Sequence, residues 1–247
     1  MKRVPIELLV VILLAGWAVT SPALGQARAT VSQTTLEEAG QLTPEISTDE
    51  LKKILTTRSE PVLDVRSATE YAIAHIPGSI NVYEKEVERV VQLFPDKAAQ
   101  FVLYCNGPYC GKGKRLSEQL VKLGYTKVKR YQLGLPVWRA LGNTVQTDLE
   151  GFRYVIAKDK TAVFVDARTA PEFAKETIPG AVNIRPGEAE KANEDGRLPY
   201  RDKGTRVIVF ANSAGEARLV SEEVAKKAYW NSSYFGGTFA DLQRARL

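Results

Sequence analysis

The chain has 247 residues, enough for one or two domains of ordinary size. Hydrophobic residues make up 44% of it and charged residues 26%, and its mean hydropathy is −0.21. This balance is that of a globular protein, and it excludes a disordered chain and a polytopic membrane protein. The formal net charge is +5, from 34 Lys+Arg and 29 Asp+Glu, and it is spread along the sequence. Such a mild excess indicates a solvated surface and no nucleic-acid partner.

The N-terminus has the pattern of a secretory signal. Two basic residues, Lys2 and Arg3, precede an apolar stretch over 8–19, which small residues follow. A helix that spans a bilayer needs about 20 apolar residues, more than this stretch supplies. We therefore expect a signal peptide over 1–25, a linker over 26–44, and a periplasmic or secreted protein. The alternative is an uncleaved N-terminal helix that anchors the protein to the membrane.

The rest of the chain contains an internal repeat. Residues 64–82 read DVRSATEYAIAHIPGSINV, and residues 166–184 read DARTAPEFAKETIPGAVNI. The two segments align without a gap at an offset of 102 residues, with Asp, Arg, Glu, Pro, Gly and Asn at matching places. This self-similarity indicates a tandem duplication. We expect one domain over 45–145 and a second over 150–247.

Each unit alternates short apolar runs with helical patterns, after a capped helix start at 48–51 in the first unit. Apolar runs without polar alternation are typical of parallel strands that are covered on both faces. The predicted strands and the helix that follows them are 61–65, 101–104 and 115–123 in the first unit, and 162–166, 207–210 and 217–225 in the second. The sequence thus predicts an α/β fold, with a mostly parallel sheet flanked by helices on both faces in each domain. Ligands of such sheets bind at the carboxyl ends of strands, here just after Tyr104 and Phe210.

The ordered motifs of the first unit resemble those of the rhodanese domain, a sulfurtransferase fold. They are D-V-R at 64–66, E-Y at 70–71, H-I-P-G-S-I-N at 75–81, the strand end at Tyr104-Cys105, and the glycine–tryptophan turn over 134–138. In rhodaneses the cysteine that opens the loop takes a sulfane sulfur from a donor and holds it as a persulfide. The resemblance implies this catalytic role for Cys105. The second unit has Ala211 at the matching position, and we expect it to do no sulfur chemistry.

The residues around Cys105 suit an anionic nucleophile. The thiolate is the reactive form of cysteine, and helix N-termini and cations stabilise it. We expect residues 106–113 to curl with their backbone N–H groups toward the sulfur, ahead of a helix from about Lys114, because glycines let the backbone approach an anion. The predicted loop residues are Asn106, Gly107, Pro108, Tyr109, Gly111, Lys112 and Gly113, and the candidate anion contacts are Lys112, Lys114 and Arg115. Alternatively, these three cations are solvated residues of a helix start.

The first loop is about two residues longer than the second, judged by the spacing to Gly124-Tyr125 and to Ala228-Tyr229. Within the rhodanese family, enlarged loops accompany changed substrates, including arsenate and phosphate esters. The expected substrate is therefore a small sulfur-containing or other anionic molecule, which need not be thiosulfate.

Cys110 places a second thiol five residues after Cys105. The turn sequence at 106–108 could bring the two sulfurs together. Cys110 would then resolve a persulfide or mixed disulfide on Cys105. Alternatively, Cys110 is a plain loop residue or closes a structural bridge.

Three functions follow from these patterns. The leading one is an exported sulfurtransferase that moves sulfane sulfur from a donor to a thiol acceptor through Cys105. The alternatives are a thiol–disulfide redox protein that uses both cysteines and a non-catalytic binding module. We expect no cofactor and no metal, because no nucleotide or haem motif is present and a single histidine, His75, is a poor zinc signature. His75 is expected to be packed or hydrogen-bonded, and the Asp-x-Arg motifs at 64–66 and 166–168 are expected to be structural.

Overall fold

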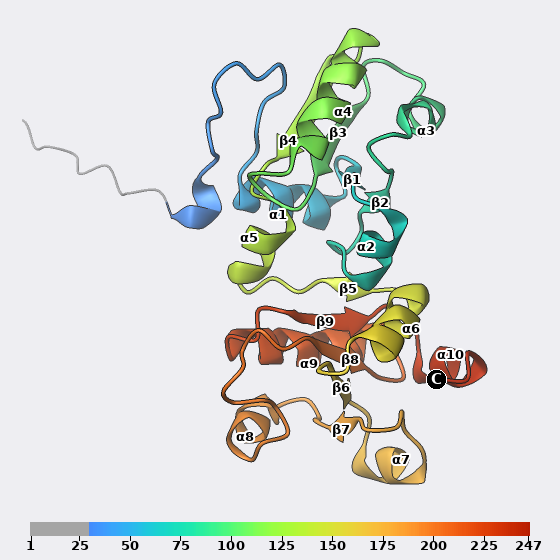
Figure 1. The fold of residues 1–247 in the computed structure, drawn as a ribbon. Coiled ribbons are helices and arrows are strands. Elements are labelled where there is room, and N and C mark those ends of the chain that lie inside the picture. The colour runs from blue at the N-terminus through green and yellow to red at the C-terminus, as the bar shows by residue number, and fades with distance from the viewer. Residues whose placement is uncertain (1–29) are drawn as a thin grey trace, which may run out of the picture.

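A computed structural model of the chain describes residues 30–247 (Figure 1). The predicted signal peptide and residues 26–29 of the predicted linker lie outside the described residues. Between residues 30 and 247, no helix is long and apolar enough to cross a membrane. Two α/β units lie one above the other, and the chain passes from the first to the second through a short strand near the middle of the molecule (Figure 1).

The first unit is built on a parallel sheet of four strands. In chain order its elements are a 3-10 turn η1 (Val31–Gln33), α1 (Thr48–Thr57), β1 (Val62–Asp64), α2 (Ala68–Ile73), β2 (Ile80–Asn81), α3 (Val87–Leu93), β3 (Gln100–Tyr104), α4 (Gly111–Lys122), β4 (Lys127–Tyr131) and α5 (Gly134–Ala140). The strand order is β2-β1-β3-β4, so β3 is an inner strand. The carboxyl end of β3 therefore lies near the middle of the sheet edge at which the parallel strands end.

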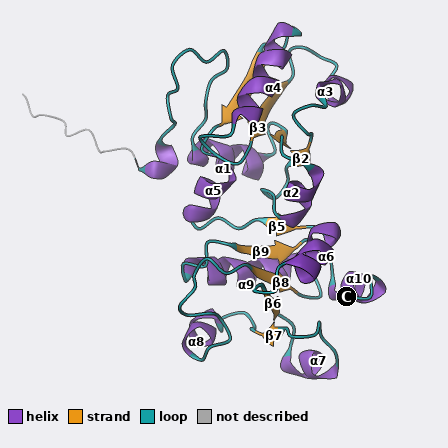
Figure 2. Cartoon of the chain, in the orientation of Figure 1, coloured by secondary structure: helices purple, strands orange, loops and turns teal. Residues whose placement is uncertain are grey.

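The second unit repeats this plan with one more strand. Its elements are β5 (Gln146–Thr147), α6 (Leu149–Lys158), β6 (Val163–Asp166), α7 (Ala170–Lys175), β7 (Val182–Asn183), α8 (Ala189–Glu194), β8 (Val207–Phe210), α9 (Ala214–Lys226), β9 (Ser232–Phe235) and α10 (Phe239–Arg244). The strand order is β5-β9-β8-β6-β7, again parallel throughout. Figure 2 shows helices around both sheets. The expected α/β class and tandem arrangement are confirmed.

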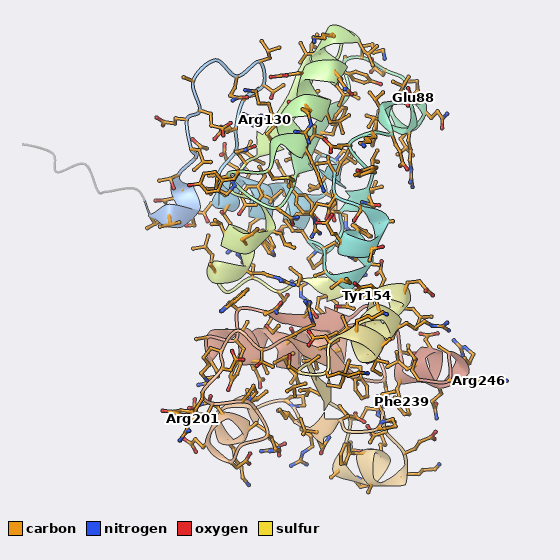
Figure 3. The ribbon with its side chains drawn as sticks, in the orientation of Figure 1. Glu88, Arg130, Tyr154, Arg201, Phe239 and Arg246 are labelled. Atoms are coloured by element: carbon orange, nitrogen blue, oxygen red, sulfur yellow. A yellow bond between two sulfur atoms is a disulfide. The ribbon has the colours of Figure 1, made fainter. Side chains whose placement is uncertain are left out.

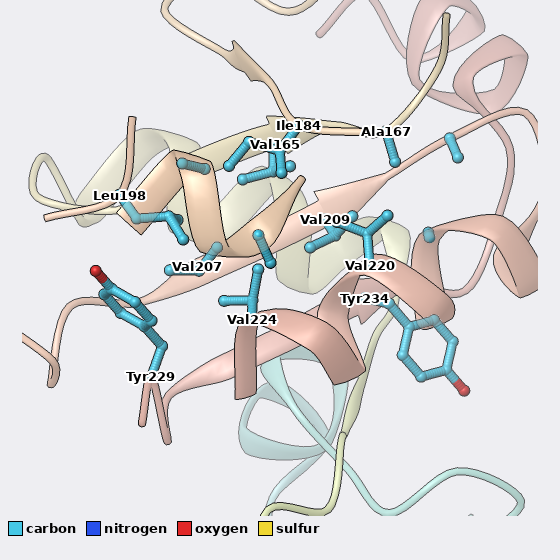
Figure 4. Close-up of a cluster of buried hydrophobic side chains, with 14 residues drawn as sticks. Val165, Ala167, Ile184, Leu198, Val207, Val209, Val220, Val224, Tyr229 and Tyr234 are labelled. Carbon is cyan, nitrogen blue, oxygen red and sulfur yellow. The ribbon is translucent and has the colours of Figure 1, made fainter. Parts of the chain in front are cut away.

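Alternate side chains of each inner strand enter different cores, which is why these strands read as continuous apolar runs. Val102 and Tyr104 face the core beneath α1 and α5, whereas Phe101 and Leu103 face the core beneath α3 and α4. The second sheet repeats the pattern. Figure 4 shows one of its cores, where the valines of β6 and β8 pack against Val220 and Val224 of α9.

Helix α4 begins at Gly111, so the expectation of a start near Lys114 was wrong. Two glycines near its start lower the intrinsic helix propensity, which made this stretch read as loop. Packing outweighs that penalty, because Leu116 and Leu120 from the same helix are completely buried against β3. Helix α1 begins as expected, with Ser47 and Glu50 forming a capping box at its N-terminus.

The two units are closely joined through α2 and α6. An alanine in place of Gly151, in α6, would overlap the carbonyl group of Ala72 in α2. Alongside, the backbones of His75 and Gln146 exchange two hydrogen bonds of 3.0 and 2.9 Å. The close approach and the paired backbone make this junction part of the fold rather than a loose link between two domains.

Residues 38–44 of the predicted linker, together with Glu45, pack onto the first unit through Arg130 of β4 (labelled in Figure 3). Arg130 is 1% exposed, and its guanidinium group contacts Glu38 at 3.4 Å and Glu45 at 3.3 Å. It also donates to Gln132 at 2.7 Å, and Gln132 donates to the carbonyl of Pro108 at 3.0 Å. This chain of contacts connects the N-terminal segment to the loop that follows β3.

Candidate functional site

Cys105 directly follows the inner strand β3, at the sheet edge where the sequence predicted a ligand site. The loop from β3 to α4 comprises residues 105–110, and Cys110 is the N-cap residue of α4. Cys105 is 5% exposed, and Tyr109 at the outer side of the loop is fully exposed. The loop therefore holds a largely buried Cys105 and leads directly into the first turn of α4, whose N–H groups have no partner within the helix itself.

The two cysteines form a disulfide. Their α-carbons are 6.3 Å apart, and the amide of Cys110 donates to the carbonyl of Gly107 at 2.9 Å. This tight turn is the one that the sequence indicated at 106–108. Neither sulfur is a free thiol in this state, so any nucleophilic step at Cys105 requires prior reduction.

Gly134 holds the base of the loop in place. The amide of Leu135 donates to the carbonyl of Cys105 at 3.0 Å, and Gly134 has a positive φ of 65°. A β-carbon at Gly134 would lie 2.5 Å from that carbonyl oxygen and would overlap the backbone of Gly107. Gly107 itself has a φ of 99°, which glycine adopts readily. The sequence indicated Gly134 only as part of a turn. Its contact with the Cys105 loop could not be predicted, because it forms only when the two segments pack together.

Asn106 is fixed by side chains from two other segments. Its amide nitrogen donates to Glu70 Oε1 at 2.5 Å, and its oxygen accepts from Arg66 Nη1 at 3.3 Å. Burial raises the pKa of the Glu70 carboxyl, but hydrogen bonds from Asn106, Ser67 and Lys112 outweigh this effect and lower the pKa to about 2. Glu70 is therefore a permanent anion at the edge of the loop at neutral pH.

Each of the three predicted anion contacts has a carboxylate neighbour. Lys112 lies 3.2 Å from Glu70, Arg115 lies 2.7 Å from Glu84, and Lys114 lies 3.9 Å from Glu118. The positive charge next to Cys105 is therefore lower than the sequence of the loop implies. Contact of these cations with a substrate stays a prediction, and it requires them to leave or share their partners.

The three glycines at 107, 111 and 113 differ in whether their surroundings and backbone conformation would accept a side chain. Gly107 is constrained by its φ, but a β-carbon at Gly113 would meet nothing within 4 Å. At Gly111 it would meet only the end of the Arg115 side chain. Close approach of these backbones to an anion stays a prediction, for Gly107 in the loop and for Gly111 and Gly113 in the first turn of α4.

Known proteins share this architecture and its motifs. The sequence model of the rhodanese-like domain matches the chain twice, over residues 47–141 and 154–244. The chain belongs to the rhodanese-like family. Thiosulfate sulfurtransferase PspE from Escherichia coli (strain K12) is 38% identical over 73 residues, which are 29% of this chain and 67% of that protein. Thiosulfate:glutathione sulfurtransferase from Homo sapiens is 32% identical over 107 residues, covering 38% of this chain and 92% of that protein.

Solved structures also match parts of the chain, with low TM-scores. The crystal structure of SseA from Escherichia coli, a 3-mercaptopyruvate sulfotransferase, is 20% identical, with a TM-score of 0.37, and the match covers 79% of this chain and 98% of that one. A rhodanese from Escherichia coli, solved with anions, is 36% identical with a TM-score of 0.27, and the match covers 29% of this chain and 84% of that one.

The second rhodanese-like domain repeats the surroundings of the loop without its chemistry. Ala211 follows β8, and the amide of Phe239 donates to its carbonyl at 2.7 Å, as Leu135 does to Cys105. Asn212 donates to Glu172 at 2.7 Å, as Asn106 does to Glu70. The loop is shorter, however, with only residues 211–213 between β8 and α9. It offers neither a thiol nor the six-residue turn of the first domain.

The residues that recur in both rhodanese-like domains make the same structural contacts in each. Arg66 holds Asp64 through Nε and Nη2, at 2.9 and 2.5 Å, and Arg168 holds Asp166 at 3.0 and 2.6 Å. The Arg168 guanidinium group also stacks on Phe239 (labelled in Figure 3), 3.4 Å from the ring centroid. Since the pairs form with or without a cysteine, their recurrence reflects the fold, as the sequence indicated.

His75 is a packed residue at the domain junction. It is 2% exposed, stacks on Tyr71 with 3.8 Å between ring centroids, and its Nδ1 lies 2.9 Å from the Tyr71 carbonyl. Burial lowers its pKa, so the neutral ring is favoured. Over residues 30–247, no group of three His, Cys, Asp or Glu side chains comes together in a way that could hold a metal ion.

Proposed function

We propose that this protein is an exported sulfurtransferase that carries sulfane sulfur as a persulfide on Cys105 of its first domain. One observation carries the proposal: Cys105 lies at the carboxyl end of an inner strand, in a loop held by Gly134, with the N-terminus of the twelve-residue helix α4 directly after it. Membership of the rhodanese-like family, with two relatives named as thiosulfate-dependent sulfurtransferases, supports the same chemistry.

The proposed transfer has two nucleophilic steps. The Cys105 thiolate attacks the outer sulfur of an anionic donor, so that a new S–S bond forms while the bond within the donor breaks and its electron pair leaves with the remaining anion. A thiol acceptor, deprotonated, then attacks the outer sulfur of the persulfide, and Cys105 leaves as a thiolate. The enzyme ends as it began, and no external oxidant or reductant is consumed.

The backbone is the main support for the thiolate in this proposal. Lys112 and Arg115 are already paired with Glu70 and Glu84, so the proposal assigns the support of the thiolate to the N–H groups at the start of α4. A helix N-terminus lowers the pKa of a cysteine thiol. The donor anion would approach the same N–H groups. The N-terminus of α4 would therefore both bind the donor and stabilise the Cys105 thiolate.

The disulfide is an oxidised form that must be opened before the cycle begins. Two electrons and two protons from a dithiol reductant convert it into the Cys105 and Cys110 thiols. Reduced Cys105 is then the nucleophile of the first step, and Cys110 remains a neighbouring thiol with its α-carbon 6.3 Å from that of Cys105 in the oxidised form.

A second candidate function, thiol–disulfide exchange, would use the same two cysteines. Here the Cys110 thiolate attacks the inner sulfur of the Cys105 persulfide, forms the Cys105–Cys110 bond and releases hydrosulfide. The Cys105–Cys110 disulfide must then be reduced again, so each turnover consumes one dithiol reductant. The two candidates differ in their product, because transfer gives a persulfide on the acceptor and exchange gives hydrosulfide.

Intact-mass spectrometry of the reduced protein tests the proposal. After removal of the reductant, incubation with thiosulfate or a polysulfide should add about 32 Da, one sulfur atom. Cys105→Ser should abolish the adduct and Cys110→Ser should keep it. An adduct on Cys105→Ser, or none on either the wild-type chain or Cys110→Ser with any donor, would refute persulfide chemistry. If the wild-type protein releases hydrosulfide and Cys110→Ser does not, exchange replaces transfer as the function.

Export is part of the same proposal and rests on the sequence of residues 1–25. A disulfide between the chain's two cysteines suits an oxidising compartment. Cell fractionation with N-terminal sequencing should find a periplasmic or secreted chain that begins near residue 26. An intact N-terminus in the membrane fraction would establish the anchored alternative, and an intact chain in the cytoplasmic fraction would contradict export.

A further inference from the structure

A cavity of about 280 Å³ lies where the two domains meet, and Asn106, the residue after Cys105, is part of its wall. The first domain contributes Arg66, Glu70, Asn106 and Arg139 to the charged and polar part of its wall, and the second contributes Arg206 and Trp230, so that one carboxylate accompanies the arginines. Three guanidinium groups thus line one small space between the domains. A cavity with this lining has the composition expected of a site for a small anion.

Two of these arginines already have carboxylate partners. Arg66 is paired with Asp64, and Arg206 Nε donates to Asp159 at 3.1 Å. Arg139, from α5, is different. Its Nη1 donates to Asn231 of the second domain at 2.9 Å, but its Nε and Nη2 are buried with no hydrogen-bond partner among the described residues.

The geometry of Arg139 indicates what would satisfy it. Nε and Nη2 share one edge of the guanidinium group, and that edge binds two oxygens of one carboxylate or oxyanion. Arg66 uses the same two atoms on Asp64, and Arg168 uses them on Asp166. In Arg139 this edge is unused, while Asn231 fixes the opposite nitrogen.

The electrostatics of the cavity point the same way. A buried charge without a partner is unfavourable, and two further cations in the wall make it more so. Burial, followed by the charges of Arg206 and Arg66, lowers the pKa of Arg139 to about 9. A bound anion would neutralise this charge and complete its hydrogen bonds, so binding and folding of the junction would stabilise each other.

We propose that this cavity binds a small anion with a carboxylate or tetrahedral oxyanion group, which the Nε and Nη2 edge of Arg139 grips in a bidentate manner. Its volume suits a small ligand. The site needs both domains, because Asn231 orients Arg139 while Arg206 and Trp230 close the wall. The second domain therefore has a binding role that needs no cysteine, and the inference does not rest on sulfur transfer.

Anion-dependent unfolding of the Cys105→Ser chain tests the proposal without interference from persulfide formation. Sulfate, thiosulfate, phosphate, acetate and succinate are compared with sodium chloride at equal ionic strength, by thermal unfolding and calorimetry. At least one of these anions should raise Tm and bind with one-to-one stoichiometry. The oxyanions and the carboxylates form separate arms, so the stronger arm identifies the class of the ligand.

The matched variants are Arg139→Gln and Arg153→Gln, the latter an arginine of α6 with a side chain that is 45% exposed. Arg139→Gln should weaken anion binding at least about tenfold, as expected for loss of a charged bidentate contact. It should also raise Tm in anion-free buffer, because it removes an unpaired buried charge. Arg153→Gln should behave as the parent chain does.

Three outcomes would overturn the proposal: no anion binds, the anions act equally on Arg139→Gln and on the parent, or Arg139→Gln lowers Tm equally in all buffers. If Arg139→Gln does not fold, Asn231→Ala gives the same test, since it removes the group that orients Arg139. It should weaken binding of the same anion, and unchanged affinity would again contradict the proposal.

Discussion

The α-carbon of Gly134, at the start of α5, lies against the backbone of Gly107 in the Cys105 loop. A side chain at Gly134 would overlap the Gly107 amide, and both residues have positive φ angles, of 65° and 99°. The amide of the next residue, Leu135, holds the Cys105 carbonyl. The two glycines therefore set the distance between α5 and the loop, and with it the position of the sulfur.

Gly134→Ala should disrupt this arrangement. The methyl group has only backbone atoms to displace, and the left-handed φ adds strain, so we expect a loss of unfolding free energy of at least about 2 kcal/mol. Sulfur loading of Cys105 should fall as well. Urea denaturation and intact-mass loading assays measure the two effects on the same samples.

Gly113→Ala is the control for this prediction. A β-carbon there meets nothing within 4 Å, and the residue lies in the first turn of α4. Alanine favours a helix over glycine by about 0.5–1 kcal/mol, so this variant should be as stable as the parent or more so, with unchanged loading. Equal damage from both substitutions would show that the contact between Gly134 and Gly107 has no special importance.

The Glu70 carboxyl predicts a pH dependence of stability. Its pKa is about 2 in the folded protein against an ordinary value of 4.5. A carboxyl group with a lowered folded-state pKa stabilises the fold above the ordinary value, and that contribution is lost as the pH falls from about 4.5 to about 2. Since the side chain is 35% exposed, solvent screening limits the effect to about 1 kcal/mol.

Glu70→Gln should remove this contribution and release Lys112 toward an anionic donor. The difference in stability between the parent and the variant at neutral pH should shrink as the pH is lowered from 4.5 to 2, and KM for an anionic donor should fall at neutral pH. Glu172→Gln, at the matching place in the second domain, should leave KM unchanged. A constant difference in stability over this pH range, or a higher KM in Glu70→Gln, would contradict the role assigned to the carboxylate.

The sequence was sufficient for the fold and for the place of Cys105. The repeat at 64–82 and 166–184 and the continuous apolar runs are local signals, and parallel topology then puts the end of β3 at a ligand-binding edge. The contacts of Lys112 with Glu70, 42 residues away, and of Arg139 with Asn231, 92 residues away, were not predictable. Both contacts depend on how elements distant in the sequence pack together, and the local pattern of charged residues does not predict this packing.

Opening the disulfide should lower stability by a limited amount. The bond closes a short loop, with a sequence separation of 5, and chain entropy then predicts a loss of about 2 kcal/mol on reduction. Denaturation with and without a phosphine reductant measures this difference. Cys110→Ser should already have the lower stability and show no further response to the reductant. A reductant effect of the same size in Cys110→Ser would show that the loss comes from elsewhere.

Ala211→Cys tests whether the first domain is active merely because it has a cysteine. Ala211 follows β8 as Cys105 follows β3, and its carbonyl accepts the equivalent hydrogen bond, from Phe239. A thiol there would be completely buried, however, in a three-residue loop with Glu216 in the first turn of the following helix. Burial and a nearby carboxylate disfavour the thiolate. In a Cys105→Ser background, Ala211→Cys should therefore gain no sulfur adduct under conditions that load Cys105 fully. Loading at the rate of Cys105 would mean that the longer loop and its surroundings add nothing to the reactivity of the sulfur.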